Sequence, residues 1–205
     1  MLSIQDVSYR YGTGASVLRH VSLEIARGDR VALLGPSGYG KSTLALLLAG
    51  YLPMQEGAVT LAGKPIPQDG YCPVQLVYQH PEKAMDPRWK LKKTLSEAWD
   101  IPADLFTAIG AQEDWLRRFP HELSGGQLQR LSILRALSPA TRVLIADEIT
   151  ASLDPITQAQ IWSVISGQAA LHDMTLIVIT HNEHLAKRIC TRIVRVEELQ
   201  DTAEH

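Results

Sequence analysis

Residues 30–43 read RVALLGPSGYGKST, a short apolar run that leads directly into a glycine-rich loop. The run at 30–34 predicts a short buried strand, and residues 41–50 predict a helix with Gly50 near its C-terminus. The loop between them matches the pattern G-x-x-x-x-G-K-[ST], which cradles phosphates when it stands between a strand and a helix. A chance match is expected in roughly one chain of this length in a hundred. The sequence therefore predicts a phosphate-binding loop.

Both the loop and the start of the helix would bind the phosphates. The backbone N–H groups of residues 38–43 would converge on a phosphate at the positive end of the helix dipole. Lys41 would reach the β- and γ-phosphates, and the Ser42 hydroxyl would ligate Mg²⁺. The nucleotide-binding residues that we expect here are Gly35, Ser37, Gly38, Gly40, Lys41, Ser42 and Thr43.

Two carboxylates, Asp147 and Glu148, follow the apolar run at 143–146. Ligands of open α/β sheets bind at the carboxyl edge of the strands. Asp147 could hold Mg²⁺ there, and Glu148 could orient and deprotonate an attacking water. The alternative is a pair of solvated carboxylates that begin a loop, and the phosphate-binding loop upstream favours the functional interpretation.

Polar and aromatic residues near other predicted strands are weaker candidates. His181 could position water against a γ-phosphate, and the Gln79 amide could sense γ-phosphate and Mg²⁺. Taken alone, each is more often a capping or merely exposed side chain. Tyr11 could stack on an adenine face, with Tyr9 as the competing choice, and either ring could instead pack against its own lobe.

A second helix start with glycines lies at Leu123-Ser124-Gly125-Gly126-Gln127. Its hydroxyl and its glycine amides would give the chain a second nucleotide-contacting surface. One ATP does not obviously need both surfaces. We therefore expect two chains to clasp two ATP molecules, with each site built from the loop of one chain and the pentapeptide of the other.

The whole chain predicts an α/β fold with a P-loop NTPase core. Alternating apolar residues at 2–9 and 17–25 indicate an N-terminal antiparallel β lobe. Strands that alternate with helices indicate a parallel central sheet with right-handed crossovers. Its strands are expected at 30–34, 74–78, 143–146 and 176–179, with a helix at 157–171. We expect a single domain over 1–205, with the core at 1–79 and 137–205 and an inserted helical subdomain at 80–136 that carries the pentapeptide.

Composition narrows the class of partner. The 205 residues are 45% hydrophobic and 20% charged, with a formal net charge of −2, so bulk electrostatics give no reason to expect a nucleic-acid partner. Cys72 and Cys190 are unclustered, which disfavours a zinc site or a disulfide framework and fits a reduced setting. The first residues lack a signal-peptide pattern, and the longest apolar stretch, 44–52, is far shorter than the roughly 20 residues of a membrane helix. We expect any contact with a membrane to pass through a partner.

Together these residues resemble the ATP-binding subunit of ABC transporters across nearly the whole chain. The pentapeptide is that family's signature, with a chance occurrence on the order of 10⁻⁴ per chain. The order of the motifs fits as well: residues 35–42 look like Walker A, Gln79 the Q-loop, 123–127 the signature, 143–147 Walker B with Glu148 as base, 152–154 the D-loop and His181 the switch histidine.

The resemblance implies ATP hydrolysis coupled to transmembrane transport, with ATP and Mg²⁺ bound. The catalytic residues would be Lys41, Gln79, Glu148 and His181, and the Mg²⁺ ligands would be Ser42, Gln79 and Asp147. The contacts with the partner's ATP would come from Ser124, Gly125, Gly126 and Gln127, and Asp154 would communicate across the dimer. One departure from the family pattern is Ile149, which stands where proline usually follows the glutamate.

The resemblance also implies partners and a location. The partners would be membrane-spanning permease subunits, whose coupling helix the helical subdomain would grip, a second ATPase chain of the same or a homologous kind, and a solute-binding protein. The chain would lie peripherally on the cytoplasmic face of the inner or plasma membrane. Residues 79–81, 85–88 and 125–130 are similar to importers of peptides or nickel and metal chelates.

The alternative is a soluble ABC ATPase of the DNA-repair or ribosome-associated type. A DNA-repair ATPase would carry a long coiled coil between Walker A and the signature, and no sustained heptads are present there. A ribosome-associated ATPase would have two cassettes and basic linkers. A P-loop kinase would leave the pentapeptide unexplained.

Overall fold

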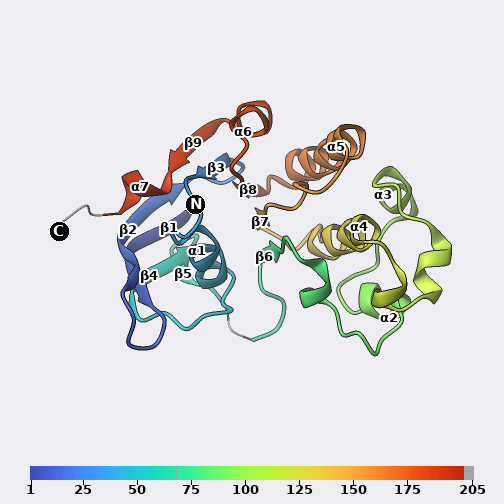
Figure 1. The fold of residues 1–205 in the computed structure, drawn as a ribbon, viewed down its shortest axis with the longest axis horizontal. Coiled ribbons are helices and arrows are strands. Elements are labelled where there is room, and N and C mark those ends of the chain that lie inside the picture. The colour runs from blue at the N-terminus through green and yellow to red at the C-terminus, as the bar shows by residue number, and fades with distance from the viewer. Residues whose placement is uncertain (68, 201–205) are drawn as a thin grey trace.

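The computed structural model describes residues 1–67 and 69–200 and shows two lobes joined along one parallel sheet (Figure 1). The first lobe carries a four-stranded antiparallel sheet in the order β2-β1-β4-β5. Gly57, at φ +80°, allows β4 to approach the backbone of Asp6 in β1, where an added Cβ would collide with the carbonyl oxygen. The strands of this sheet are β1 (Leu2–Arg10), β2 (Ser16–Ile25), β4 (Glu56–Leu61) and β5 (Lys64–Pro65).

The second sheet is wholly parallel, in the order β6-β7-β8-β3-β9. Because the strands are parallel, their carboxyl ends all meet at one edge. Register places the end of β7 beside the end of β8, with Asp147 opposite Ile179. The strands are β3 (Arg30–Leu34), β6 (Val74–Val77), β7 (Val143–Asp147), β8 (Thr175–Ile179) and β9 (Arg192–Arg195).

Helices cover both faces of this sheet, and the strand residues alternate between two cores. In β7, Ile145 packs with α1 (Lys41–Leu48) in one core, whereas Leu144 packs with α4 (Gly125–Ala136) and α5 (Pro155–His172) in the other. Strands β3, β7 and β8 are therefore buried on both sides, which explains why the sequence of each contains a continuous apolar run.

The second lobe, green to yellow in Figure 1, is the predicted helical segment between β6 and β7. Its short elements pack around buried Ile109 and Trp115, and the Trp99 indole donates to the carbonyl of Leu134 in α4 at 3.0 Å. Besides α4, the elements are the 3₁₀ helices η1 (Pro81–Ala84), η2 (Glu113–Arg117) and η3 (Pro120–Glu122), with α2 (Leu91–Ser96) and α3 (Ala103–Ala108).

The fold class is confirmed, and the differences are local. The first helix ends at Leu48, before Gly50, which adopts φ +76°. Helix α5 begins two residues earlier than expected because Pro155 suits a first helical turn. The sequence did not predict β4, β5, β9, α6 (Glu183–Ile189) or α7 (Val196–Leu199).

The exact division into subdomains at 79/80 and 136/137 stays a prediction, and residues 201–205 lie outside the described part of the chain. Within residues 1–67 and 69–200, none of the helices combines the length and apolar character that crossing a bilayer requires.

Candidate nucleotide-binding site

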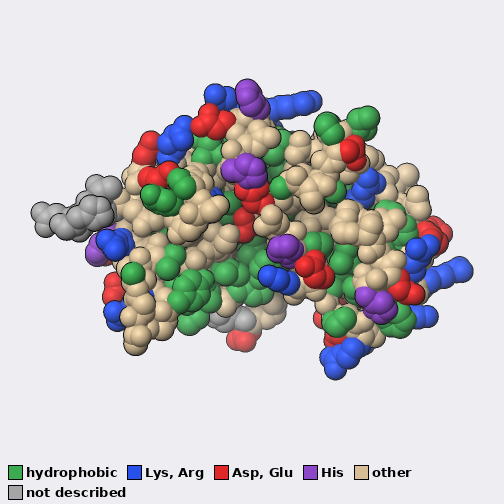
Figure 2. All heavy atoms as spheres, in the orientation of Figure 1, with side chains coloured by type: hydrophobic (Ala, Val, Ile, Leu, Met, Phe, Trp, Pro, Cys, Tyr) green, Lys and Arg blue, Asp and Glu red, His purple; other side chains and the backbone are tan. Residues whose placement is uncertain are grey.

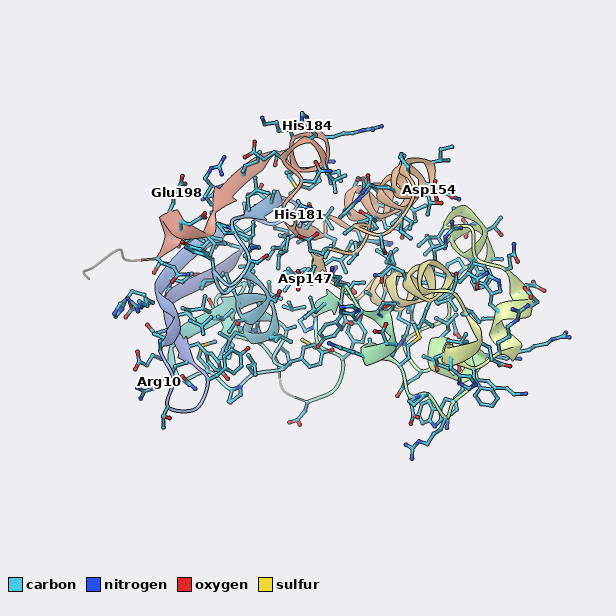
Figure 3. The ribbon with its side chains drawn as sticks, viewed as in Figure 1. Arg10, Asp147, Asp154, His181, His184 and Glu198 are labelled. Carbon is cyan, nitrogen blue, oxygen red and sulfur yellow. The ribbon has the colours of Figure 1, made fainter. Side chains whose placement is uncertain are left out.

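The carboxyl ends of β3, β6, β7 and β8 bring many of the predicted site residues into one cavity of about 440 Å³. Figure 3 shows Asp147 and His181 close together at this edge. In Figure 2, acidic and histidine side chains gather near the centre of the face, over the region where the central strands end. The cavity is lined by Val17, Ser37, Gly38, Gly40, Lys41, Ser42, Thr43, Gln79, Asp147, Glu148, Ile179 and His181.

Gly40 lets the loop turn into α1. It is the N-cap residue and adopts the left-handed conformation at φ +82°. A Cβ there would lie 2.6 Å from Leu18 Cδ2 and 2.9 Å from the Val17 carbonyl oxygen, so only glycine fits. The first N–H groups of a helix have no partner within the helix. The loop therefore presents the amides of α1 and its positive dipole end to the cavity.

Lys41 begins α1 and bends back over the loop. Its Nζ donates to the carbonyl oxygens of Gly35 at 2.6 Å and Pro36 at 2.7 Å. Gly35 itself is not among the residues that line the cavity. It lies where the loop leaves β3, and its φ of +148° lets the Glu197 carboxylate pack against its Cα.

Asp147 and Ser42 both line the cavity with side-chain oxygen atoms. Burial raises the pKa of Asp147, the Glu148 charge adds to this effect, and a hydrogen bond from Ser42 and the Lys41 charge oppose it. Hydroxyl, amide and carboxylate oxygens are what Mg²⁺ prefers. Because Ser42, Gln79 and Asp147 share the cavity, their donor set fits Mg²⁺. Among the described residues, no group of three or more His, Cys, Asp or Glu could hold a metal.

Glu148 and His181 form a contact pair beside Asp147. The Glu148 carboxylate accepts from the His181 backbone N–H at 3.1 Å, and its Oε1 lies 2.8 Å from His181 Nδ1. The Glu148 side chain is 17% exposed, whereas that of His181 is 75% exposed. The pair therefore combines a sheltered carboxylate with an imidazole that is open to the cavity.

The two tyrosines that could stack on adenine, Tyr9 and Tyr11, differ in their exposure. Tyr9 is buried in the core of the first lobe, and Tyr11 is 50% exposed and packs edge-on against it. The Tyr11 hydroxyl lies 3.2 Å from Thr43 Oγ1, at the rim of the cavity. Of the two rings, only Tyr11 has a face free to stack on a planar ligand.

The pentapeptide lies outside this cavity, on the second lobe. Ser124 caps α4: its Oγ accepts from Gln127 N–H at 3.3 Å, and Gln127 Oε1 accepts from Ser124 N–H at 3.0 Å. Gly126 leaves room for Leu153, whose Cδ2 lies 3.0 Å from where a Cβ would stand.

Asp154 also lies apart from Asp147 and His181 (Figure 3). It caps α5 by accepting from the N–H groups of Ile156 at 3.1 Å and Thr157 at 3.0 Å. These hydrogen bonds, from Thr157 foremost, lower the pKa of Asp154. The structure thus brings most of the predicted residues together and leaves residues 124–127 and Asp154 on a separate surface.

Sequence reasoning missed a group next to Glu148. Thr150 accepts hydrogen bonds from Gln158 and Trp162 of α5, beside the cavity. The only sequence signal was the spacing of four residues between Gln158 and Trp162, which places two side chains on one helix face without indicating their target.

Comparison with known sequences identifies relatives. The family described as "ABC transporter" matches residues 18–151. A putative peptide import ATP-binding protein of Brucella abortus (strain 2308) is 33% identical over 92% of this chain, which spans 63% of that relative's length. The nickel import system ATP-binding protein NikE of Staphylococcus aureus (strain N315) is 30% identical over 97% of this chain and 87% of its own.

Solved structures agree on the fold. CbiO1 of Clostridium perfringens, part of the ABC transporter complex cbiONQ, has a TM-score of 0.74 at 25% identity over 95% of this chain and 83% of its own. A dimeric ATP-binding cassette bound to ADP and Pi has a TM-score of 0.80 at 24% identity over 98% of this chain and 95% of its own, which speaks to the fold alone. The cavity, the motifs and these relatives together show that this chain belongs to the ABC transporter family of ATP-binding proteins.

Proposed function

We propose that this chain binds ATP with Mg²⁺, hydrolyses the ATP and thereby powers a membrane importer. The observation that carries the proposal is the single cavity that gathers Lys41, Asp147 and Glu148 at the ends of parallel strands. Phosphoryl transfer needs a cation and a helix N-terminus for the phosphates, oxygen ligands for Mg²⁺ and a group that orients water. Lys41 and the start of α1, the oxygens of Ser42 and Asp147, and Glu148 are the candidates for these roles in this cavity.

Different residues of the site would bind different parts of the nucleotide. The loop amides and Lys41 would hold the phosphates, and Tyr11 would stack on the adenine. Ser42, Gln79 and Asp147 would hold Mg²⁺. When bound, Mg²⁺ neutralises charge on the phosphate oxygens.

Glu148 would act as the general base. As the water oxygen bonds to the γ-phosphorus, the bond from that phosphorus to the bridging oxygen breaks, ADP and phosphate form, and Glu148 accepts the water proton. His181 would hold the Glu148 carboxylate through the 2.8 Å contact and face the γ-phosphate with the rest of its ring.

A second chain, the same or homologous, would complete the site. Residues 124–127 and Asp154 lie outside the cavity that holds Lys41, so they are free to contact a nucleotide bound by the partner. Two such chains would enclose two ATP molecules, open after hydrolysis and move the attached permease.

The permease would dock in a groove of about 940 Å³ between the lobes, where the surface in Figure 2 is recessed along the lower edge. Tyr51 and Tyr78 form one wall, with ring centroids 5.8 Å apart, and Arg135 stands on the other. Burial raises the pKa of Tyr78 to about 12, so this wall is neutral. The Gln129 amide donates to the Tyr78 carbonyl at 3.2 Å and ties α4 to the segment just before Gln79. A helix in the groove would therefore touch both lobes.

The cargo class follows from the named relatives, which are peptide and nickel import proteins. We propose peptides, or nickel and metal chelates, delivered by a solute-binding protein, with this chain peripheral on the cytoplasmic face. The same names disfavour a soluble, non-transport ATPase. Uptake of labelled Ni²⁺ and of a labelled dipeptide, by cells with and without this chain, separates the cargoes. Loss of neither uptake would overturn the cargo proposal.

The proposed base is tested by Glu148→Gln in the purified chain. Hydrolysis should fall at least about 100-fold, the scale of a lost general base, while ATP affinity stays within twofold. Phosphate release and fluorescent-ATP binding give the two readouts. Glu198→Gln, on an exposed carboxylate of α7 that lies away from the site (Figure 3), should keep the full rate. Full turnover by Glu148→Gln would remove Glu148 as the base.

The phosphate cradle is tested separately by Lys41→Ala. Loss of the ammonium should weaken ATP binding by more than about tenfold, because the proposed charge-assisted contact to phosphate is lost. Isothermal titration with Mg²⁺ and ATP measures this affinity. Lys92→Ala, on the exposed side of α2, is the matched control. Equal affinities for the Lys41 variant and the control would contradict the assignment.

A further inference from the structure

The turn that carries Glu148 is unusual in its backbone. Glu148 adopts φ +53°, the left-handed region that residues with a Cβ rarely occupy. The turn from Glu148 to Leu153 reads EITASL, without the proline or glycine that most often fixes a turn. Backbone hydrogen bonds hold part of it: Glu148 N–H donates to the Ile179 carbonyl at 3.0 Å, Ala151 N–H to the Glu148 carbonyl at 3.2 Å and Leu153 N–H to the Thr150 carbonyl at 3.2 Å. Other contacts must fix the direction in which the turn leaves β7.

Thr150 receives those contacts. Its Oγ1 accepts from Gln158 Nε2 at 2.9 Å and from Trp162 Nε1 at 3.1 Å. A threonine hydroxyl has two acceptor lone pairs, and these two donors fill both. Gln158 Nε2 also lies 3.4 Å from the Thr150 carbonyl oxygen. Thr150 is 2% exposed and Trp162 is 5% exposed, so water competes little for these hydrogen bonds.

The two donors come from one face of α5. Gln158 and Trp162 are four residues apart, so they stand one above the other on the helix. The helix is fixed at its start by the Asp154 cap and along its length by packing of Ile161 and Ile165 in the core. We define Thr150, Gln158 and Trp162 as the Thr150 clamp, which ties the turn to a rigid helix.

The clamp borders the reacting carboxylate. A polar cavity of about 230 Å³ is lined by Glu148 and His181 and also by Thr150, Gln158 and Trp162. None of the three clamp residues lines the 440 Å³ cavity that contains Lys41 and Glu148. The clamp would therefore act on that cavity through the turn. Simple core packing explains the Trp162 ring, but it does not explain why an amide and an indole N–H both point at one hydroxyl.

We propose that Gln158 and Trp162, through Thr150, are positioning residues that aim Glu148 at the attacking water. This inference rests on the proposed role of Glu148 as the general base. Loosening the clamp lets the carboxylate move away from its position at the end of β7. Hydrolysis then slows while ATP binding, which would depend on Lys41 and the glycine-rich loop, is retained. The expected signature is a loss in kcat with an unchanged KM.

The test compares Thr150→Val, which keeps the shape and removes the acceptor, with Thr150→Ser, which keeps the hydroxyl. Thr150→Val should lower kcat roughly 10- to 100-fold, as a misplaced catalytic group does, with KM within twofold. Thr150→Ser should recover kcat to within about threefold. Thr107→Val, on an exposed threonine of α3, is the control for the substitution itself. Wild-type kcat in Thr150→Val, or no recovery in Thr150→Ser, would overturn the proposal.

A second variant keeps the test valid if Thr150→Val fails to fold. Trp162→Phe removes one donor and keeps most of the ring, and it should lower kcat with KM unchanged. When Thr150→Val or Trp162→Phe is added to Glu148→Gln, the residual rate of ATP hydrolysis should fall no further, because the effect of each clamp substitution passes through Glu148. An equal fold-loss in both backgrounds would mean a general structural role. If Glu148→Gln itself hydrolyses ATP normally, the proposed base fails first and the outcome is distinguishable.

Discussion

Two side chains, Glu148 and His181, show how this chain would hold the proposed base in place. The carboxylate is held by a backbone N–H and faces the ring of the same histidine at 2.8 Å. Both residues follow directly from neighbouring strands, so their separation is fixed by the sheet rather than by a long loop. Preorganised groups need no rearrangement when charge develops, and this is where such sites gain most of their effect.

The ionised carboxylate of the neighbouring Asp147 should lower the free energy of unfolding, and this effect can be measured. Its folded-state pKa is raised, mainly by burial, above its unfolded value near 3.8. The folded protein therefore binds the proton more tightly than the unfolded chain, and this contribution to stability is lost as pH rises through the folded pKa. We expect Asp147→Asn to stabilise the ligand-free protein at pH 7, because the amide carries no charge to desolvate.

Urea unfolding of both proteins, in EDTA and without nucleotide, at steps from pH 4.5 to 8, checks this expectation. The stability gained by Asp147→Asn should grow with pH and level off above the folded pKa of Asp147. Asp69→Asn, on an exposed aspartate that does not line the cavity, is the control for the substitution itself. A gain that is constant or shrinks with pH would contradict the burial effect.

The sequence predicted most of the residues that line the 440 Å³ cavity, because their motifs are local and follow apolar strands. It could not identify the Thr150 clamp. The donors to Thr150 come from 8 and 12 residues later, and their direction depends on where α5 packs. It also could not decide between Tyr9 and Tyr11, because that choice depends on which ring the core of the first lobe buries.

Among the elements, burial decided what could be predicted. Strands β3, β7 and β8 are buried on both faces, so each is an unbroken apolar run with an unambiguous pattern. Strand β4 has no buried residue and β9 has one, and α7 is only four residues long. Such short or exposed elements depend on their neighbours for stability and leave little pattern in the sequence.

The start of α4 offers a test of an element by itself. Ser124 caps this helix through its contact with Gln127 N–H, so Ser124→Ala should lower the free energy of unfolding by about 1 kcal/mol. In a domain of this size, that loss lowers Tm by roughly 2–4 °C. Ser124→Asp, which can still cap, should stay near the wild-type Tm, as calorimetry would show. Equal losses in both variants would mean that capping is not what Ser124 contributes to stability.

The residues proposed to contact nucleotide lie on two separate surfaces of the molecule. Lys41 and Glu148 share the cavity at the strand ends, whereas residues 124–127 and Asp154 lie toward the second lobe. The caps at Ser124 and Asp154 hold both helix starts in place within one chain, so the second surface is already formed in the monomer. A surface that is preformed but distant from its own cavity is what a clasped pair of chains would need.

That arrangement predicts an ATP-dependent dimer that depends on space at Ser124. Glu148→Gln with ATP and Mg²⁺ should form a stable dimer, because ATP would be held between the chains and not consumed. Adding Ser124→Arg should keep this variant monomeric while each chain still binds ATP, since the longer side chain would occupy the place of the partner's phosphates. Size-exclusion chromatography with light scattering measures both states. Ser124→Ala is the control for the lost cap. Ser96→Arg, at an exposed position of α2, is the control for the added charge. A normal dimer in the Ser124→Arg variant would rule out contact between the pentapeptide and the partner's ATP.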